Sequence, residues 1–61
     1  MSFTAKHMLV IGAGVSGFAA AEIGRKYGAA VTLSDAKAEK DLPFDFEPMK
    51  KLGVRLVFGH P

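Results

Sequence analysis

Apolar and polar residues alternate in blocks along this chain, and the blocks predict the order strand, helix, strand, helix, strand. Residues 7–11 contain the unbroken run Met8-Leu9-Val10-Ile11, which favours a parallel strand buried on both faces. Residues 30–34 and 54–58 are predicted to form the second and third strands. Right-handed crossovers place the three strands parallel in the spatial order 3-2-1. The pattern therefore predicts an α/β fold, half of a Rossmann-like domain with two connecting helices.

Glycine and proline mark the ends of the two predicted helices. The first helix spans about 14–27 and stops at Gly28, and the second is a helix of about two turns that begins near Pro48 and ends at Gly53. Small residues at helical spacing predict that one face of the first helix lies close to the sheet. These residues are Gly17, Ala20, Ala21, Gly24 and Gly28. Ile23 and Tyr27 form a second apolar pair, and the charged residues Glu22, Arg25 and Lys26 are predicted to face solvent. Phe44, Phe46 and Phe58 are predicted to pack in the core.

Length and charge restrict the function classes. Residues 1–61 make at most one small domain, and the chain has no cysteine. The net charge of +2 is spread along the chain, so nucleic acid is not an expected partner. No apolar run approaches the roughly 18 residues of a membrane span, and no signal peptide is recognisable. We therefore expect a cytoplasmic protein with no membrane partner.

The sequence Gly12-Ala13-Gly14-Val15-Ser16-Gly17 joins the first strand to the first helix. In this G-x-G-x-x-G pattern the first glycine allows a sharp turn, the second allows a phosphate to approach the backbone, and the third allows close packing. Asp35 ends the second strand 18 positions after Gly17. An acidic residue there accepts hydrogen bonds from ribose hydroxyls in dinucleotide-binding domains. Phe18-Ala19 stand where a P-loop requires Lys-Ser/Thr, so this segment is not predicted to bind ATP through a P-loop.

Three blocks of the chain resemble the N-terminal domain of the Mur ligase family, in particular its D-glutamate-adding members. The blocks are Gly12-Ala13-Gly14-Val15-Ser16-Gly17-Phe18-Ala19-Ala20-Ala21, Gly28-Ala29-Ala30-Val31-Thr32-Leu33-Ser34-Asp35 and Leu52-Gly53-Val54-Arg55-Leu56-Val57-Phe58-Gly59. The resemblance implies the UDP-binding part of an ATP-dependent ligase of peptidoglycan synthesis, which adds D-glutamate to UDP-N-acetylmuramoyl-L-alanine. In that family a substrate carboxylate is phosphorylated to an acyl phosphate, which the amine of the amino acid attacks. ATP and Mg²⁺ would bind a central domain absent from this chain, so the chain alone is expected to bind no cofactor or metal and to have no catalytic residue.

The resemblance also implies which residues contact UDP. Gly14, Val15, Ser16 and Gly17 would lie close to the diphosphate and uridine, and Asp35, Ala36 and Lys37 close to the uracil and ribose. Some family members carry a hydroxyl where Ala36 stands. Lys37 would lie along the base or attract the diphosphate, unless it is an ordinary solvated lysine.

Two alternatives remain open from the sequence. An FAD- or NAD-dependent oxidoreductase would also use the glycine motif, and NAD enzymes tolerate an aspartate such as Asp35 at the end of the second strand. The other alternative is a half-Rossmann chain that binds no ligand tightly. The first strand has no partner at one edge, so we expect a possible homodimer through that edge.

Overall fold

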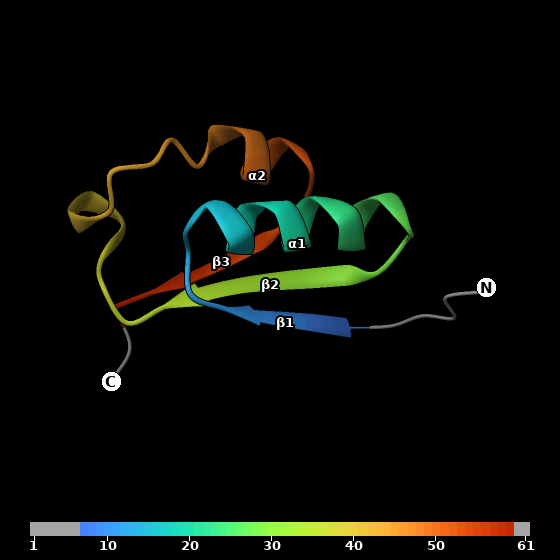
Figure 1. Cartoon of the computed structure of the whole chain (residues 1–61), viewed down its shortest axis with the longest axis horizontal. Helices are drawn as coiled ribbons and strands as arrows, with labels where there is room; N and C mark the ends of the chain where they lie inside the picture. Colours follow the sequence, from blue (N-terminus) through green and yellow to red (C-terminus); the bar gives the residue numbers. More distant parts are fainter. Residues whose placement is uncertain (1–6, 60–61) are drawn as a thin grey trace.

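A computed structural model describes residues 7–59. Its sheet has the order β1 (His7–Ile11), β2 (Ala30–Asp35), β3 (Arg55–Phe58), and both strand pairs are parallel. Helix α1 (Val15–Lys26) joins β1 to β2, and the 3₁₀ turn η1 (Glu39–Asp41) and helix α2 (Glu47–Lys51) lie between β2 and β3. The predicted half-Rossmann architecture is confirmed (Figure 1). Helix α2 is shorter than the predicted two turns.

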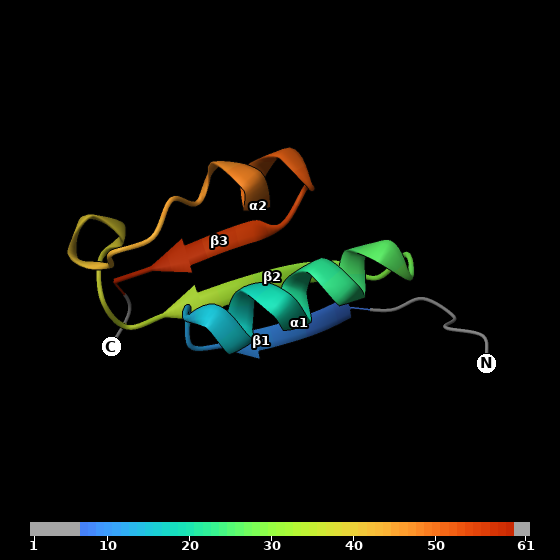
Figure 2. The same cartoon turned by 45° about the horizontal axis from the view of Figure 1, so that its top comes forward.

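Both helices lie on the same side of the sheet (Figures 1 and 2). Of the predicted stripe of small residues, Gly17, Ala21 and Gly24 are buried and Ala20 is half-buried. The prediction is wrong for Gly28, which is exposed because α1 ends at Lys26 and no longer carries it towards the sheet. A Cβ atom added to Gly24 would approach Met8 Sδ to 2.6 Å and Val31 Cγ2 to 2.9 Å. Glycine at this position therefore lets α1 rest directly on β1 and β2. No helix in the described part of the chain is long and apolar enough to cross a membrane.

Aromatic rings fill the space between α1, α2 and β3. The Phe46 side chain is 2% exposed, and its ring centroid lies 5.1 Å from that of Phe18 and 4.9 Å from that of Phe58. Phe44 joins the same cluster at 5.5 Å from Phe18. These spacings are typical of tilted and edge-to-face aromatic packing. The prediction that Phe44, Phe46 and Phe58 form core is confirmed.

The prediction that the first strand is buried on both faces is wrong. Met8 and Val10 pack against the core, whereas Leu9 is 59% exposed and Ile11 is 78% exposed. The physical reason is that the two connections cross on one side of the sheet and leave the other side uncovered (Figure 1). The apolar run of residues 8–11 indicates a strand with apolar side chains on both faces. It does not show which other elements cover each face.

The prediction that Arg25 faces solvent is also wrong. Its guanidinium Nε donates to the Leu52 carbonyl at 2.7 Å, and Nη1 donates to the Ala29 carbonyl at 2.9 Å. Leu52 caps the C-terminal end of α2, and Ala29 precedes β2. Arg25 therefore satisfies backbone acceptors from two connections that the sequence pattern does not relate to it.

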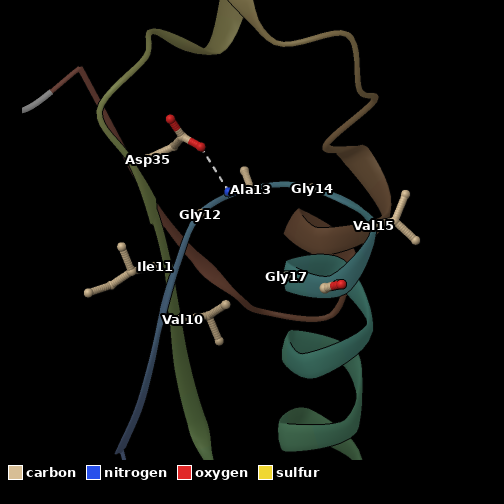
Figure 3. A pocket seen from close by; sticks show the side chains of 9 residues that line it. Val10, Ile11, Gly12, Ala13, Gly14, Val15, Gly17 and Asp35 are labelled. Carbon is tan, nitrogen blue, oxygen red and sulfur yellow. Dashed lines mark hydrogen bonds between the residues drawn. The ribbon is translucent and has the colours of Figure 1, made fainter.

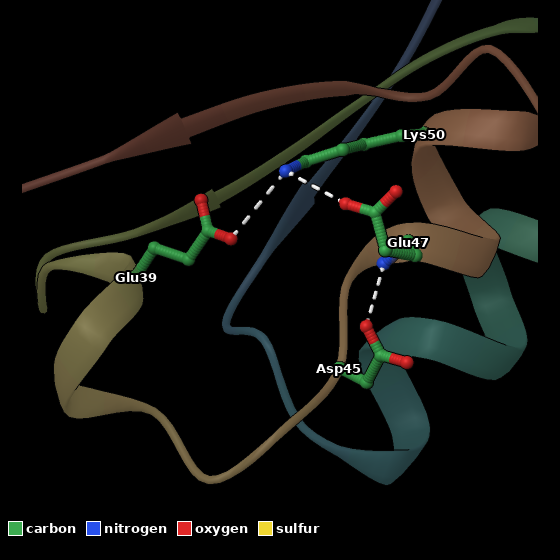
Figure 4. A network of polar contacts seen from close by, with 4 residues as sticks. All are labelled: Glu39, Asp45, Glu47 and Lys50. Atoms are coloured by element: carbon green, nitrogen blue, oxygen red, sulfur yellow. Dashed lines mark hydrogen bonds and ion pairs between the residues drawn. The ribbon is translucent and has the colours of Figure 1, made fainter.

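The η1–α2 connection carries an exposed polar network (Figure 4). Lys50 Nζ lies 3.2 Å from a Glu47 carboxylate oxygen and 3.6 Å from one of Glu39. The hydrogen bond with Glu47 and the charges of both carboxylates raise the pKa of Lys50. Asp45 accepts the backbone N–H of Glu47 at 3.0 Å, close to the start of α2. Because these ion pairs are exposed to solvent, they add little to the free energy of unfolding, and their main effect is on the orientation of this connection.

Candidate functional site

The turn between β1 and α1 depends on two glycines of the predicted motif. Gly12 has φ +101°, a conformation that glycine adopts without strain, and its N–H donates to the Ser34 carbonyl at 2.7 Å. Gly17 faces this turn, and a Cβ there would collide with the Gly12 carbonyl oxygen. The structural roles predicted for Gly12 and Gly17 are therefore confirmed.

Gly14 differs from these two glycines because the fold does not require it. Its φ of −147° and ψ of −167° are an extended conformation that any residue can adopt, and a Cβ added there would meet nothing within 4 Å. The space beside Gly14 is open, which leaves room for a ligand to approach the backbone closely.

The first turn of α1 presents backbone donors to the same space. The first bond of this helix runs from the Phe18 N–H to the Gly14 carbonyl, so the amides of Val15, Ser16 and Gly17 precede the helical ladder. No acidic residue lies in this first turn. Unpaired N–H groups and the positive end of the helix dipole favour an anion at this position.

An open cleft of about 550 Å³ lies at this helix start (Figure 3). It is lined by the end of β1, the glycine motif and the end of β2, through Val10, Ile11, Gly12, Ala13, Gly14, Val15, Ser16, Gly17 and Asp35. The structure therefore brings together five predicted site residues: Gly14, Val15, Ser16, Gly17 and Asp35. Ala36 and Lys37 are exposed on the following loop and do not line the cleft. Val10 and Ile11 were not predicted as site residues, because the apolar pattern predicted only that they belong to the first strand.

Asp35 joins the two loops of the site. Its Oδ2 accepts the backbone N–H of Ala13 at 2.9 Å, and its Oδ1 accepts the backbone N–H of Lys37 at 2.9 Å. Each carboxylate oxygen thus accepts a backbone amide, one in the glycine motif and one in the loop after β2. Figure 3 shows the bond to Ala13. This bridge sets the distance between the glycine motif and residues 35–37. Within residues 7–59, no group of three His, Cys, Asp or Glu side chains could hold a metal ion.

We expect Asp35→Asn to destabilise the chain by about 1–2 kcal/mol, because one of the two backbone N–H groups would then face an amide NH₂ instead of an oxygen. Urea unfolding measures this loss, and amide exchange should speed up at Ala13 or Lys37. Asp45→Asn is the matched control, since Asp45 uses only Oδ1 for the Glu47 amide and asparagine keeps that acceptor. Equal effects of the two substitutions would contradict the bridging role.

Comparison with known families places this geometry among Rossmann-like segments. Residues 2–52 match the family model described as alanine dehydrogenase/PNT, C-terminal domain. The match covers more than half of the chain, so at the level of this segment the chain belongs to that family.

Curated relatives are more specific. A UDP-N-acetylmuramoylalanine–D-glutamate ligase of Lactobacillus helveticus is 42% identical over 59 residues, which is 97% of this chain and 13% of that protein. The ligases of the same name from Lactobacillus acidophilus and Koribacter versatilis are 46% and 37% identical, over 92% and 98% of the chain. The chain belongs to the UDP-N-acetylmuramoylalanine–D-glutamate ligase family. No solved structure matches it significantly.

The two comparisons name different enzymes and cover different lengths of the chain. The family model ends at residue 52. The ligase relatives match almost the whole chain, which includes β3. The resemblance to D-glutamate-adding ligases is thereby confirmed, and the chain spans about one eighth of the length of the relatives it matches.

Proposed function

We propose that the chain is the UDP-binding part of an ATP-dependent ligase that adds D-glutamate to UDP-N-acetylmuramoyl-L-alanine in the cytoplasm. The observation that carries the proposal is the open space beside Gly14, next to the first-turn amides of α1. The relatives indicate the substrate, since their names contain a UDP-linked amino sugar and D-glutamate.

The diphosphate of UDP would lie at the start of α1. Backbone N–H groups of Val15, Ser16 and Gly17 would donate to its oxygens, and the absence of a side chain at Gly14 would permit the close approach. Asp35 would hold the second loop in place through the Ala13 and Lys37 amides, so that residues 35–37 reach the ribose and uracil. The net charge of +2 does not oppose binding of an anion.

Catalysis would belong to parts of the ligase outside this segment. The residues after Gly17 are Phe18 and Ala19, which offer neither the lysine nor the hydroxyl of an ATP-binding P-loop. The proposed contribution of this segment is to bind and orient the nucleotide end of the substrate. We therefore propose that the isolated chain has no ligase activity and binds neither ATP nor Mg²⁺.

Binding of a nicotinamide dinucleotide is the second candidate. The matching family model bears the name of a dehydrogenase, and dehydrogenases of this fold place an acidic residue at the end of the second strand, as Asp35 is placed here. A carboxylate oxygen can accept more than one hydrogen bond, so the amide bonds of Asp35 do not exclude a ribose hydroxyl in either candidate. The UDP proposal is favoured because the ligase relative matches 97% of the chain, whereas the dehydrogenase model matches residues 2–52.

An amide NMR titration with UDP, NAD and FAD in turn separates the candidates. We expect UDP-selective shifts at residues 14–17 and 35–37. Selective shifts with NAD or FAD would assign the site to an oxidoreductase instead, and no shift with any of the three would show that this segment alone does not bind a nucleotide.

We expect Gly14→Ala to weaken UDP binding by about tenfold or more, which corresponds to about 1.4 kcal/mol. The added methyl group would enter the space reserved for phosphate, while the extended backbone of Gly14 accepts alanine without strain. The same titration measures the affinity, and the dispersion of the amide spectrum verifies the fold. An unchanged UDP affinity in a folded variant would place the phosphates away from Gly14.

A further inference from the structure

The C-terminal end of β3 lies beside the loop that follows β2 (Figures 1 and 2). Gly59, directly after β3, donates its backbone N–H to the Asp35 and Lys37 carbonyl oxygens, at 3.1 Å each. We propose that Gly59 is a positioning residue for the nucleoside end of the UDP-linked substrate, and that it acts through residues 35–37 without lining the cleft itself. This inference rests on the proposed function, which assigns the ribose and uracil to residues 35–37.

Residues 35–37 form a turn that hydrogen bonds close at both ends. Asp35 Oδ1 accepts the Lys37 N–H at 2.9 Å, which is the pattern of an Asx turn. The carbonyls of the same two residues converge on the single Gly59 N–H, so this bond is three-centred. Ala36 is the middle residue of the turn and is exposed. The turn therefore has a defined shape before any ligand binds.

The turn is also attached to the strands on both sides of β2. On the β1 side, Asp35 Oδ2 accepts the Ala13 N–H at 2.9 Å. On the β3 side, the donor is Gly59, and the ring of the preceding residue, Phe58, packs 4.9 Å from that of the buried Phe46. The aromatic core thus fixes the Gly59 amide, and that amide fixes the turn.

A turn that is already ordered favours binding of the group that contacts it. Ordering a loop during binding costs conformational entropy, and a preorganised loop avoids that cost. The proposed diphosphate donors at residues 15–17 belong to the start of α1 and make no printed bond with Gly59. Gly59 should therefore affect binding of the nucleoside part of UDP and leave binding of phosphate unchanged.

Gly59→Pro tests the inference, with Gly59→Ala as its matched control. Both substitutions remove the freedom of glycine at φ +74°, but only proline removes the N–H that bonds to Asp35 and Lys37. We expect Gly59→Pro to bind UDP about tenfold or more weakly than Gly59→Ala, and both to bind inorganic pyrophosphate like the parent chain. Amide NMR titration measures the affinities and verifies the fold. Equal UDP affinities of the two variants, or an equal loss for UDP and pyrophosphate with proline, would overturn the inference.

The parent chain provides a test that does not depend on the fold of the proline variant. UDP should shift the Gly59 amide signal although Gly59 does not line the cleft, and pyrophosphate should leave that signal in place. A Gly59 signal that ignores UDP while residues 35–37 respond would contradict the inference.

Amide exchange without ligand separates the failure of this inference from that of the proposed function. The Gly59 amide of the parent chain should be protected from exchange, and the Lys37 amide should exchange faster in Gly59→Pro than in Gly59→Ala. An unprotected Gly59 amide, or equal Lys37 rates, would show that Gly59 does not fix the turn. A parent chain with both exchange results as expected but no affinity for UDP would instead refute the proposed function and, with it, a role of Gly59 in nucleoside binding.

Discussion

Gly17→Ala is expected to prevent the chain from folding. The added methyl group would overlap the Gly12 carbonyl oxygen and would also lie 3.4 Å from Leu33 Cδ1. Gly12 cannot move aside, because its φ of +101° and its N–H bond to Ser34 fix the turn. Forced overlap in a packed site costs about 1–3 kcal/mol or more, and a domain of this size has little stability to lose. Far-UV circular dichroism and amide dispersion measure the outcome.

Gly14→Ala provides the matched control for this experiment, since the same methyl group is added to the same motif but meets nothing within 4 Å. We expect the Gly14 variant to be folded under conditions in which the Gly17 variant is not. If both variants unfold alike, the sensitivity belongs to the motif as a whole. If both fold alike, the contact between α1 and the turn is looser than the structure shows.

The sequence predicts those parts of the fold that local chemistry determines. The apolar runs locate all three strands to within one residue, and the glycines mark the β1–α1 turn and the end of α1. The right-handed crossover rule, together with the glycine motif typical of Rossmann-like domains, then predicts the observed strand order. The sequence does not predict which faces of the sheet are covered, because the apolar run of β1 is the same whether helices cover one face or both. Leu9 and Ile11 are therefore exposed despite a pattern typical of a buried strand.

The sequence predicts those parts of the candidate site whose residues lie close together along the chain. Residues 14–17 follow from the spacing of the glycines, and the cleft forms where that spacing places it. Asp35 was predicted from its position at the end of β2, but not its bonds to the Ala13 and Lys37 amides. Side chains that bind backbone across the fold leave no periodic signal, since a single charged residue looks the same in solvent and in such a bridge.

Arg25 shows the same limit with a larger energetic consequence. It lies in the last turn of α1, where a cation suits the helix dipole, and the residue pattern suggests nothing more. Its two donors nevertheless reach carbonyls 27 and 4 positions away, at Leu52 and Ala29. One planar guanidinium thus holds the end of α2 and the approach to β2 against the end of α1, which a point-like ammonium cannot do.

Arg25→Met is accordingly expected to lower the free energy of unfolding by about 3 kcal/mol, since two hydrogen bonds from a charged donor are lost while the apolar stem is kept. Arg25→Lys should retain one of the two bonds and fall between this variant and the parent chain. Urea unfolding measures each value. Lys26→Met is the control, because it removes the same charge from the same helical turn at an exposed residue. A loss for Arg25→Met no greater than that for Lys26→Met would assign the effect to helix electrostatics, whereas a clear excess would locate it in the link between α1, α2 and β2.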